Sequence, residues 1–227
     1  MDCEIIGTGS SGNAVVVNGN ILIDCGLPFA KIRPYYKSLK LVLLTHAHSD
    51  HFNKSAVGRL AYTRPTLRFA TPPYLIPKII EAGVKAPQID VMTYGTTYEY
   101  HGFDLEPFKL THNLPNTGYK IYLENGEKVI YATDTNNLDS VEAKDFDLYL
   151  IEANHTEEDI RRRIKAKEKN GEFAYEKMAE INHLSKEKAD DFIYKNIGAK
   201  GRYIYLHGHI DRQGKEEESG GDQRQMG

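Results

Sequence analysis

Short apolar runs separated by glycine- and asparagine-rich turns give the first half of the chain a β-rich pattern. The run "KLVLLTH" is continuously apolar, which is typical of a strand buried on both faces. Segments 55–63 and 74–83 have helical character, and Gly83 is a helix-ending signal for the second. We expect strands at 3–7, 14–17, 21–26, 40–46 and 67–73.

Apolar and alternating runs return in the second half, before the pattern becomes helical and charged at about 156–197. Asn125-Gly126 predicts a tight hairpin turn between two of these runs. The two β-rich blocks, each followed by helix, predict a mixed α and β class with helices outside two sheets. We expect strands at 91–100, 103–110, 119–125, 128–134, 147–153 and 201–209.

The length of 227 residues suits one domain, or one domain with an insertion. We expect one domain over 1–212, with a helical insertion at about 156–197. The segment 213–227 is rich in glycine and polar residues and has little to bury, so we expect a disordered tail.

Composition and charge indicate which binding partners, membranes or nucleic acids, to expect. No run approaches the roughly 18 apolar residues of a membrane span, and the first residues lack the basic and apolar regions of a signal peptide. We therefore expect a cytoplasmic protein that does not bind membranes. The formal net charge is −3, so a nucleic-acid site has to be a local basic patch. Cys3 and Cys25 lie in apolar segments without a C-x-x-C motif, which indicates reduced core residues.

Histidine is the residue type that stands out, because most of the nine histidines follow a strand-like segment. The stretch "HAHSDH" places His46, His48 and Asp50 at every second position after an apolar run, with His51 next. If the chain stays extended there, the first three point the same way and His51 points differently. One strand exit could therefore present ligands to two neighbouring metal ions, and imidazole and carboxylate groups suit zinc or manganese.

The remaining ligands have to come from elsewhere in the chain. His112, Asp134 and His207 each end an apolar strand-like run. A single histidine at a strand end is more often a surface or hydrogen-bonded residue than a ligand. A cluster of three beside a buried strand makes little sense without a metal. A purely structural zinc is the weaker alternative, because such sites favour cysteine-rich closed sets and no cysteine is near.

The His-x-His-x-Asp-His motif, followed by a later His, an Asp and a last His, resembles the metallo-β-lactamase-fold hydrolase superfamily. "GTGSSGNAVVV" and "ILIDCG" are similar to that superfamily's opening strands, and the resemblance covers about 1–212. It implies an α+β fold, an αββα sandwich of two mixed β-sheets with helices outside. It also implies two divalent metal ions, zinc or manganese.

The resemblance implies a ligand set residue by residue. His46, His48 and His112 would hold one metal; Asp50, His51 and His207 would hold the other; Asp134 would bridge both. Asp24 resembles the carboxylate that orients a ligand imidazole, although it is also a plausible turn residue. "LHGH" leaves His209 as an alternative to His207.

Two later segments resemble the YycJ-type, tRNase Z-related nuclease branch of the superfamily: "EANH", followed by a basic helical insertion, and then "HLS". The resemblance implies that His155 and His183 contact the phosphate or protonate the leaving group, so that the expected catalytic residues are Asp50, His155 and His183. A helix-end contact for His155 and a capping-region role for His183 are the alternatives. Asn113 departs from the branch, which usually has Asp after the third-motif histidine.

The run from Arg161 to Lys169 is basic, and it could line a nucleic-acid groove or form a solvated helix balanced by neighbouring acids. Two divalent ions would leave the expected site net cationic, which favours an anionic phosphodiester. We expect a phosphodiesterase that acts on nucleic acid, above all a DNA exonuclease. A small-molecule hydrolase acting on a cyclic nucleotide, thioester or lactone is the alternative, and a metal-dependent binding module without turnover is a third. The oligomeric state is undecided by the sequence.

Overall fold

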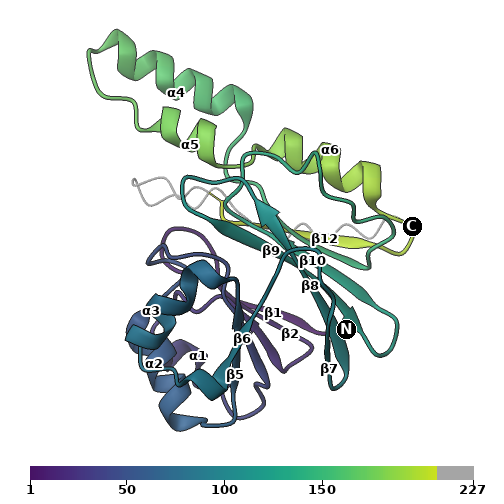
Figure 1. Ribbon diagram of the computed structural model, residues 1–227. Coiled ribbons are helices and arrows are strands. Elements are labelled where there is room, and N and C mark those ends of the chain that lie inside the picture. The colour runs from purple at the N-terminus through teal and green to yellow at the C-terminus, as the bar shows by residue number, and fades with distance from the viewer. Residues whose placement is uncertain (209–227) are drawn as a thin grey trace. The chain divides into compact units, whose positions relative to one another are not determined.

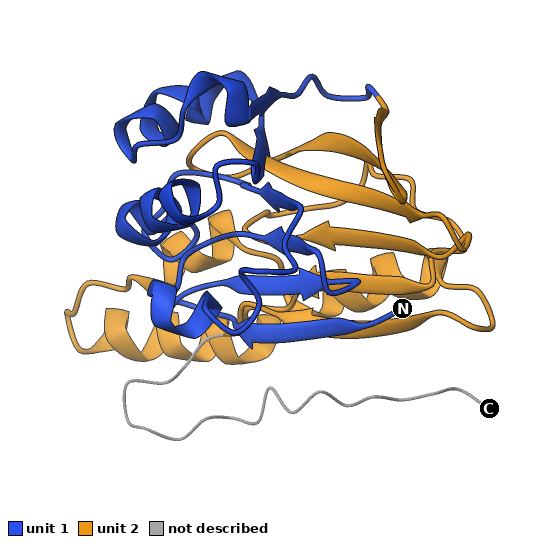
Figure 2. Cartoon of the chain, turned by 90° about the horizontal axis from the view of Figure 1, so that it is seen from below, with its two compact units in different colours: residues 1–96 blue, residues 97–227 orange. Residues whose placement is uncertain are grey.

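The computed structural model describes residues 1–208, and the chain divides into two compact units, Met1–Thr96 and Thr97–Gly227, which Figure 2 colours separately. His209 and the tail 213–227 lie outside the described residues. The expectation of one domain over 1–212 stays a prediction. Within residues 1–208, no helix is both long and apolar enough to cross a membrane.

The first unit contains a mixed six-stranded sheet in the order β1-β2-β3-β4-β5-β6. β1, β2 and β3 pair antiparallel, whereas β3, β4, β5 and β6 run parallel. Its strands are β1 (Cys3–Gly7), β2 (Ala14–Val17), β3 (Ile21–Ile23), β4 (Leu41–Leu43), β5 (Arg68–Thr71) and β6 (Ile89–Val91). Its helices are α1 (Phe29–Ile32), α2 (Lys54–Thr63) and α3 (Ile76–Glu81), with 3-10 turns η1 (Pro73–Leu75) and η2 (Ala86–Gln88).

Alternation along the strands of the first unit places one set of apolar side chains on the face that the helices cover. Val42 of β4 and Phe69 of β5 pack in one core cluster with Leu60 of α2 and Ile79 of α3. The helices α1, α2 and α3 lie together beside this sheet (Figure 1). The helix α2 begins at Lys54, one residue before the expected segment, and the Asn53 side chain caps it by accepting a hydrogen bond from the Ala56 N–H.

The second unit contains another mixed six-stranded sheet, in the order β12-β11-β10-β9-β8-β7. β7 to β10 pair antiparallel, and β10, β11 and β12 run parallel. Its strands are β7 (Tyr98–Tyr100), β8 (Phe103–Leu110), β9 (Asn116–Leu123), β10 (Lys128–Ala132), β11 (Leu148–Glu152) and β12 (Arg202–Leu206). Its helices are α4 (Glu157–Lys169), α5 (Glu176–Asn182) and α6 (Lys186–Asn196).

The helices of the second unit have two different settings. Phe192 and Ile193 of α6 pack on Tyr149 and Ile151 of β11, so α6 covers the sheet. α4 and α5 form a hairpin that projects beyond the sheet of this unit, with its own small core around Ile160 and Ile164. The helical stretch expected at 156–197 is therefore three helices, of which only the last covers the sheet.

Several local predictions need correction. The expected strand 21–26 ends at Ile23, because Asp24 has a left-handed backbone with φ of 60°. The expected strand 91–100 is two short strands, β6 and β7, on either side of a loop. The short helix α1 gave no recognised signal in the sequence pattern.

Candidate metal centre

The loop after β4 turns back on itself instead of continuing the strand. The N–H groups of His51 and Phe52 both donate to the His48 carbonyl, over 3.0 and 2.8 Å. The expectation that His46, His48 and Asp50 share one side of an extended chain is therefore wrong. Backbone hydrogen bonding within the turn decides where these side chains point.

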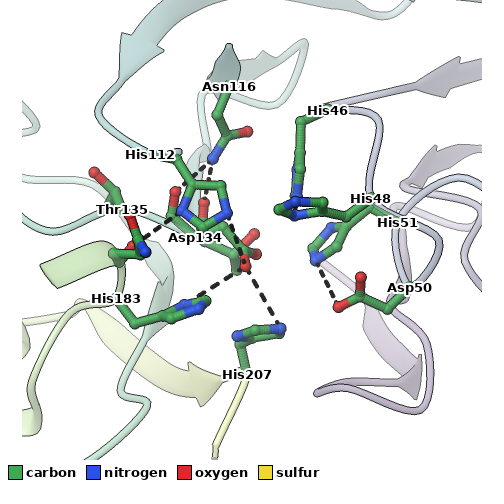
Figure 3. Close-up of polar contacts among 12 residues, drawn as sticks. His46, His48, Asp50, His51, His112, Asn116, Asp134, Thr135, His183 and His207 are labelled. Carbon is green, nitrogen blue, oxygen red and sulfur yellow. Dashed lines mark hydrogen bonds and ion pairs between the residues drawn. The ribbon is translucent and has the colours of Figure 1, made fainter. Parts of the chain in front are cut away.

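The four polar side chains of this loop form two pairs (Figure 3). His46 Nε2 lies 3.0 Å from His48 Nδ1, and His51 Nε2 lies 3.5 Å from Asp50 Oδ2. His46 and His51 are fully buried, whereas His48 and Asp50 are partly exposed. These are the pairings that the resemblance assigns to two separate metals; the assignment itself stays a prediction.

The Asp24 side chain forms hydrogen bonds with residues of this loop. Its carboxylate accepts hydrogen bonds from the Thr45 N–H at 3.0 Å and from the Thr45 hydroxyl at 2.9 Å. It also lies 2.6 Å from His51 Nδ1. A carboxylate only accepts, so the proton is on Nδ1 and the lone pair is on Nε2, the nitrogen that would bind a metal. Asp24 is completely buried, which suits an orienting residue.

Asn13 and Gly26 fix the position of Asp50. The Asn13 backbone N–H donates to the Asp50 carbonyl over 2.6 Å, and its side-chain Nδ2 lies 2.8 Å from His51 Nε2. A Cβ on Gly26 would lie 1.7 Å from the Asp50 carbonyl oxygen. Only glycine allows two backbone segments to approach so closely, and this gives "DCG" and "SSGN" a physical role.

In the second unit, three acidic or histidine residues stand at the carboxyl ends of adjacent parallel strands. Asp134 follows β10, Glu152 ends β11 and His207 follows β12. Carboxyl ends of parallel strands meet at one sheet edge, where α/β proteins bind ligands. Asp134, Glu152, His183 and His207 each offer a ligand atom within 4.8 Å of the others.

Asp134 is the centre of this group, as Figure 3 shows. Its Oδ1 lies 3.6 Å from His183 Nδ1, 3.6 Å from His207 Nε2 and 3.9 Å from His112 Nε2. Asp134 and His207 have left-handed φ values of 57° and 56°. That conformation costs an L-residue about 1–2 kcal/mol and persists only where the surroundings enforce it.

Glu152 is a site residue that sequence reasoning did not assign. It is fully buried, and its Oε1 lies 2.6 Å from His183 Nδ1 and 3.1 Å from His207 Nδ1. Its Oε2 accepts from the N–H groups of Thr135 and Leu184. Burial by itself would raise the pKa of Glu152, but the two histidine hydrogen bonds hold it below the usual value. A charge ending the apolar run "LYLIE" was the available signal.

The two histidines expected to be catalytic have different surroundings. Burial opposes protonation of His183, yet the hydrogen bond to Glu152 and the negative charge of Asp134 raise its pKa. For His155, burial is the largest influence and lowers the pKa, with Glu152 opposing it. His183 belongs to the group around Asp134, whereas His155 lies outside that group and its Nδ1 is 3.3 Å from Asn154 Oδ1.

The end of α5 contacts the site through His112. His112 Nδ1 lies 3.0 Å from the Asn182 carbonyl, which only accepts and therefore places the lone pair on Nε2, toward Asp134. The Ser185 side chain accepts from the Lys188 N–H and caps α6. His183 thus sits in the tight connection between α5 and α6.

The basic run on α4 is balanced by acids. Arg161 pairs with Glu157, Arg162 and Arg163 pair with Asp159, and Lys167 pairs with Glu176. Of the two interpretations left open by the sequence, the structure favours a solvated, charge-balanced helix.

The chain belongs to the beta-lactamase superfamily, because the family model described as "Beta-lactamase superfamily domain" matches residues 19–191. Among curated proteins it is similar to exodeoxyribonuclease WalJ of Streptococcus pneumoniae. The two sequences are 26% identical over 240 residues, which cover 95% of this chain and 83% of the relative.

Solved structures show the fold. The chain resembles human tRNase Z, short form, with a TM-score of 0.71, 16% identity and 94% coverage of both chains. It also resembles the metallo-beta-lactamase fold protein YhfI from Bacillus subtilis, with a TM-score of 0.69, 17% identity and coverage of 93% and 87%. The expected α+β class with two mixed sheets and helices, of the metallo-β-lactamase type, is confirmed.

The residues present fit the divalent ions that this fold implies. In each unit, imidazole nitrogens and carboxylate oxygens converge at one edge of the sheet, and these are the donors that zinc and similar ions prefer. The buried acids Asp24 and Glu152 hydrogen-bond to the candidate ligand histidines His51 and His207, which is the usual arrangement around metal-binding histidines.

Proposed function

We propose that this chain is a metal-dependent phosphodiesterase that acts on nucleic acid, and specifically a DNA exonuclease. The proposed ligands are His46, His48 and His112 for one ion, Asp50, His51 and His207 for the other, and Asp134 for both. The ions are zinc or manganese. They would act as Lewis acids that polarise the phosphate and make water nucleophilic near neutral pH.

The observation that carries the proposal is that the buried Glu152 carboxylate contacts two histidines, His183 and His207, for which we propose different roles. Glu152 Oε1 contacts His207 Nδ1, which leaves the lone pair of His207 on Nε2, the nitrogen proposed to bind metal. The same Oε1 lies 2.6 Å from His183 Nδ1. His183 is about one-fifth exposed, so it reaches both the buried acid and solvent. A histidine held in this way can keep a proton and pass it to a leaving alkoxide.

The roles of the other residues follow from their positions. Asp50 would hold metal and help to align the reacting groups, since its carboxylate is partly exposed beside His51. His155 is half-buried after β11, with its backbone carbonyl accepting from the Lys186 N–H. We propose that His155 contacts the substrate phosphate, because it follows the strand that ends at Glu152.

A DNA substrate is supported by the comparison with a curated relative. The curated relative is named an exodeoxyribonuclease and aligns over almost the whole of this chain. The likeness to the human tRNase Z structure bears on the fold alone. The charge balance on α4 is the observation that favours the alternative, a small-molecule hydrolase, because it removes one candidate surface for a polymer.

Digestion of end-labelled double-stranded DNA, with manganese and with zinc, tests the proposal. The wild-type protein should release mononucleotides, and Asp50→Ala should not. Contamination by another nuclease is controlled by preparing both proteins identically. If the metal-loaded protein leaves DNA intact, the exonuclease assignment is wrong, and hydrolysis of cyclic nucleotides then tests the alternative. Binding of DNA that weakens steeply with salt also distinguishes the two, because only a polymer releases many counterions.

A further inference from the structure

We propose that Asn116 and Asn154 are positioning residues whose buried side-chain amides hold the backbones of Asp134 and His207 in the conformation that binds metal. This inference rests on the proposed function, since it assumes that both residues are ligands. It concerns asparagines to which neither the sequence motifs nor the comparisons assign a role.

The backbone conformation of Asp134 and His207 is the reason to look for positioning residues. Asp134 and His207 each follow a parallel strand, and each leaves it with a left-handed φ. The two side chains lie close together, with His207 Nε2 3.6 Å from Asp134 Oδ1. Asp and His adopt the left-handed conformation more readily than most L-residues, but it still costs free energy, so fixed partners for the peptide groups on either side stabilise it.

Asn116 supplies those partners at Asp134. It is the first residue of β9 and is 1% exposed. Its Nδ2 donates to the Thr133 carbonyl over 2.8 Å and to the Asp134 carbonyl over 2.7 Å. Carbonyls only accept, so the orientation of the amide is fixed, and its Oδ1 accepts from the Thr117 N–H. One side chain therefore holds both peptide groups of the turn.

Asn154 has the equivalent place at His207. It follows β11 and is 9% exposed, and its Nδ2 donates to the His207 carbonyl over 3.0 Å. Its backbone N–H donates to the Leu184 carbonyl over 2.9 Å. Leu184 is the residue after His183, so Asn154 connects the backbones that carry both histidines contacted by Glu152.

Asn196 provides a matched control within the same unit. Its Nδ2 donates to the Phe192 carbonyl over 2.8 Å, which is the same type of bond as those of Asn116 and Asn154. It stands at the end of α6, a helix that contributes no proposed ligand. Loss of its amide should affect stability without affecting metal binding.

The test compares Asn116→Ala, Asn154→Ala and Asn196→Ala in the full chain. Zinc affinity is measured by competition with a chromophoric chelator, and the Tm of each metal-free protein is measured separately. We expect zinc affinity to fall by about 10- to 100-fold in the first two variants, the usual effect of losing an outer partner of a ligand. Asn196→Ala should bind zinc as the wild type does.

Asn116 is deeply buried, so Asn116→Ser is included in case the alanine variant does not fold. Its hydroxyl can donate to one of the two carbonyls, and zinc affinity should lie between those of alanine variant and wild type. A lowered Tm with wild-type zinc affinity in both the Asn116 and the Asn154 variants would show that these asparagines are merely structural.

Asp134→Ala separates failure of this inference from failure of the proposed site. If Asp134→Ala binds zinc like the wild type, Asp134 is not a ligand and both proposals are wrong. If Asp134→Ala loses zinc while the Asn116 and Asn154 variants keep wild-type affinity, only the positioning role is wrong.

Discussion

The two units differ in how far apart in the sequence their candidate site residues lie. In the first unit, four candidate ligands come from one six-residue loop, His46 to His51, supported by Asp24 and Asn13. In the second, the group around Asp134 is collected from separate strand ends and from the α5–α6 connection, over almost a hundred residues of chain. A local motif is visible in the sequence, whereas a dispersed group depends on strand order and on buried partners such as Glu152.

Asp134→Ala should have the largest effect on function, because it removes the carboxylate that three histidines of the second unit surround. We expect loss of activity together with loss of bound metal, measured by elemental analysis of the purified protein. Unchanged metal content would contradict the assignment of Asp134 as the shared ligand.

Gly26→Ala should be the most damaging change in the first unit, because the new Cβ would overlap the Asp50 carbonyl. We expect a loss of about 3 kcal/mol or more in the free energy of unfolding, measured with urea. Gly19→Ala is the control, since its Cβ would meet open space and only the left-handed φ of 66° opposes it, at about 1–2 kcal/mol. Equal losses in the two variants would show that the close approach at Asp50 is unimportant.

His183→Ala tests whether His183 transfers a proton without being a metal ligand. Turnover should slow by about 10²-fold or more, the usual scale for a lost proton-transfer group, while metal content stays at the wild-type level. Wild-type turnover would make His183 merely structural, and loss of metal would make it a ligand. His101, which is exposed in the turn between β7 and β8, gives the control variant His101→Ala, with no expected change.

Arg162→Ala should have the smallest effect. Arg162 is 77% exposed and pairs with Asp159 on the surface of α4, so stability should change by less than about 0.5 kcal/mol. The salt dependence of DNA binding should also stay unchanged. If DNA binding by this variant depended less on salt than that of the wild type, α4 would be part of the nucleic-acid-binding surface.

The sequence by itself determined the β-rich pattern, the mixed α and β class with two sheets, and the loop motif. These features are local, because alternation of apolar residues sets strands and His46 to His51 stand in one short segment. Resemblance then related the motif to its superfamily. The strand-end positions of His112, Asp134 and His207 were also visible, although their proximity to one another was not.

Only the tertiary structure decided which buried groups support the candidate ligands. Glu152 becomes a site residue because β11 lies between β10 and β12, and Asn116 contacts the Asp134 backbone because β9 pairs with β10. The turn after β4 likewise depends on hydrogen bonds to the His48 carbonyl and on the close approach of Gly26 to Asp50. Hydrogen bonds between residues distant in sequence are set by strand pairing and burial, which no local pattern of residues records.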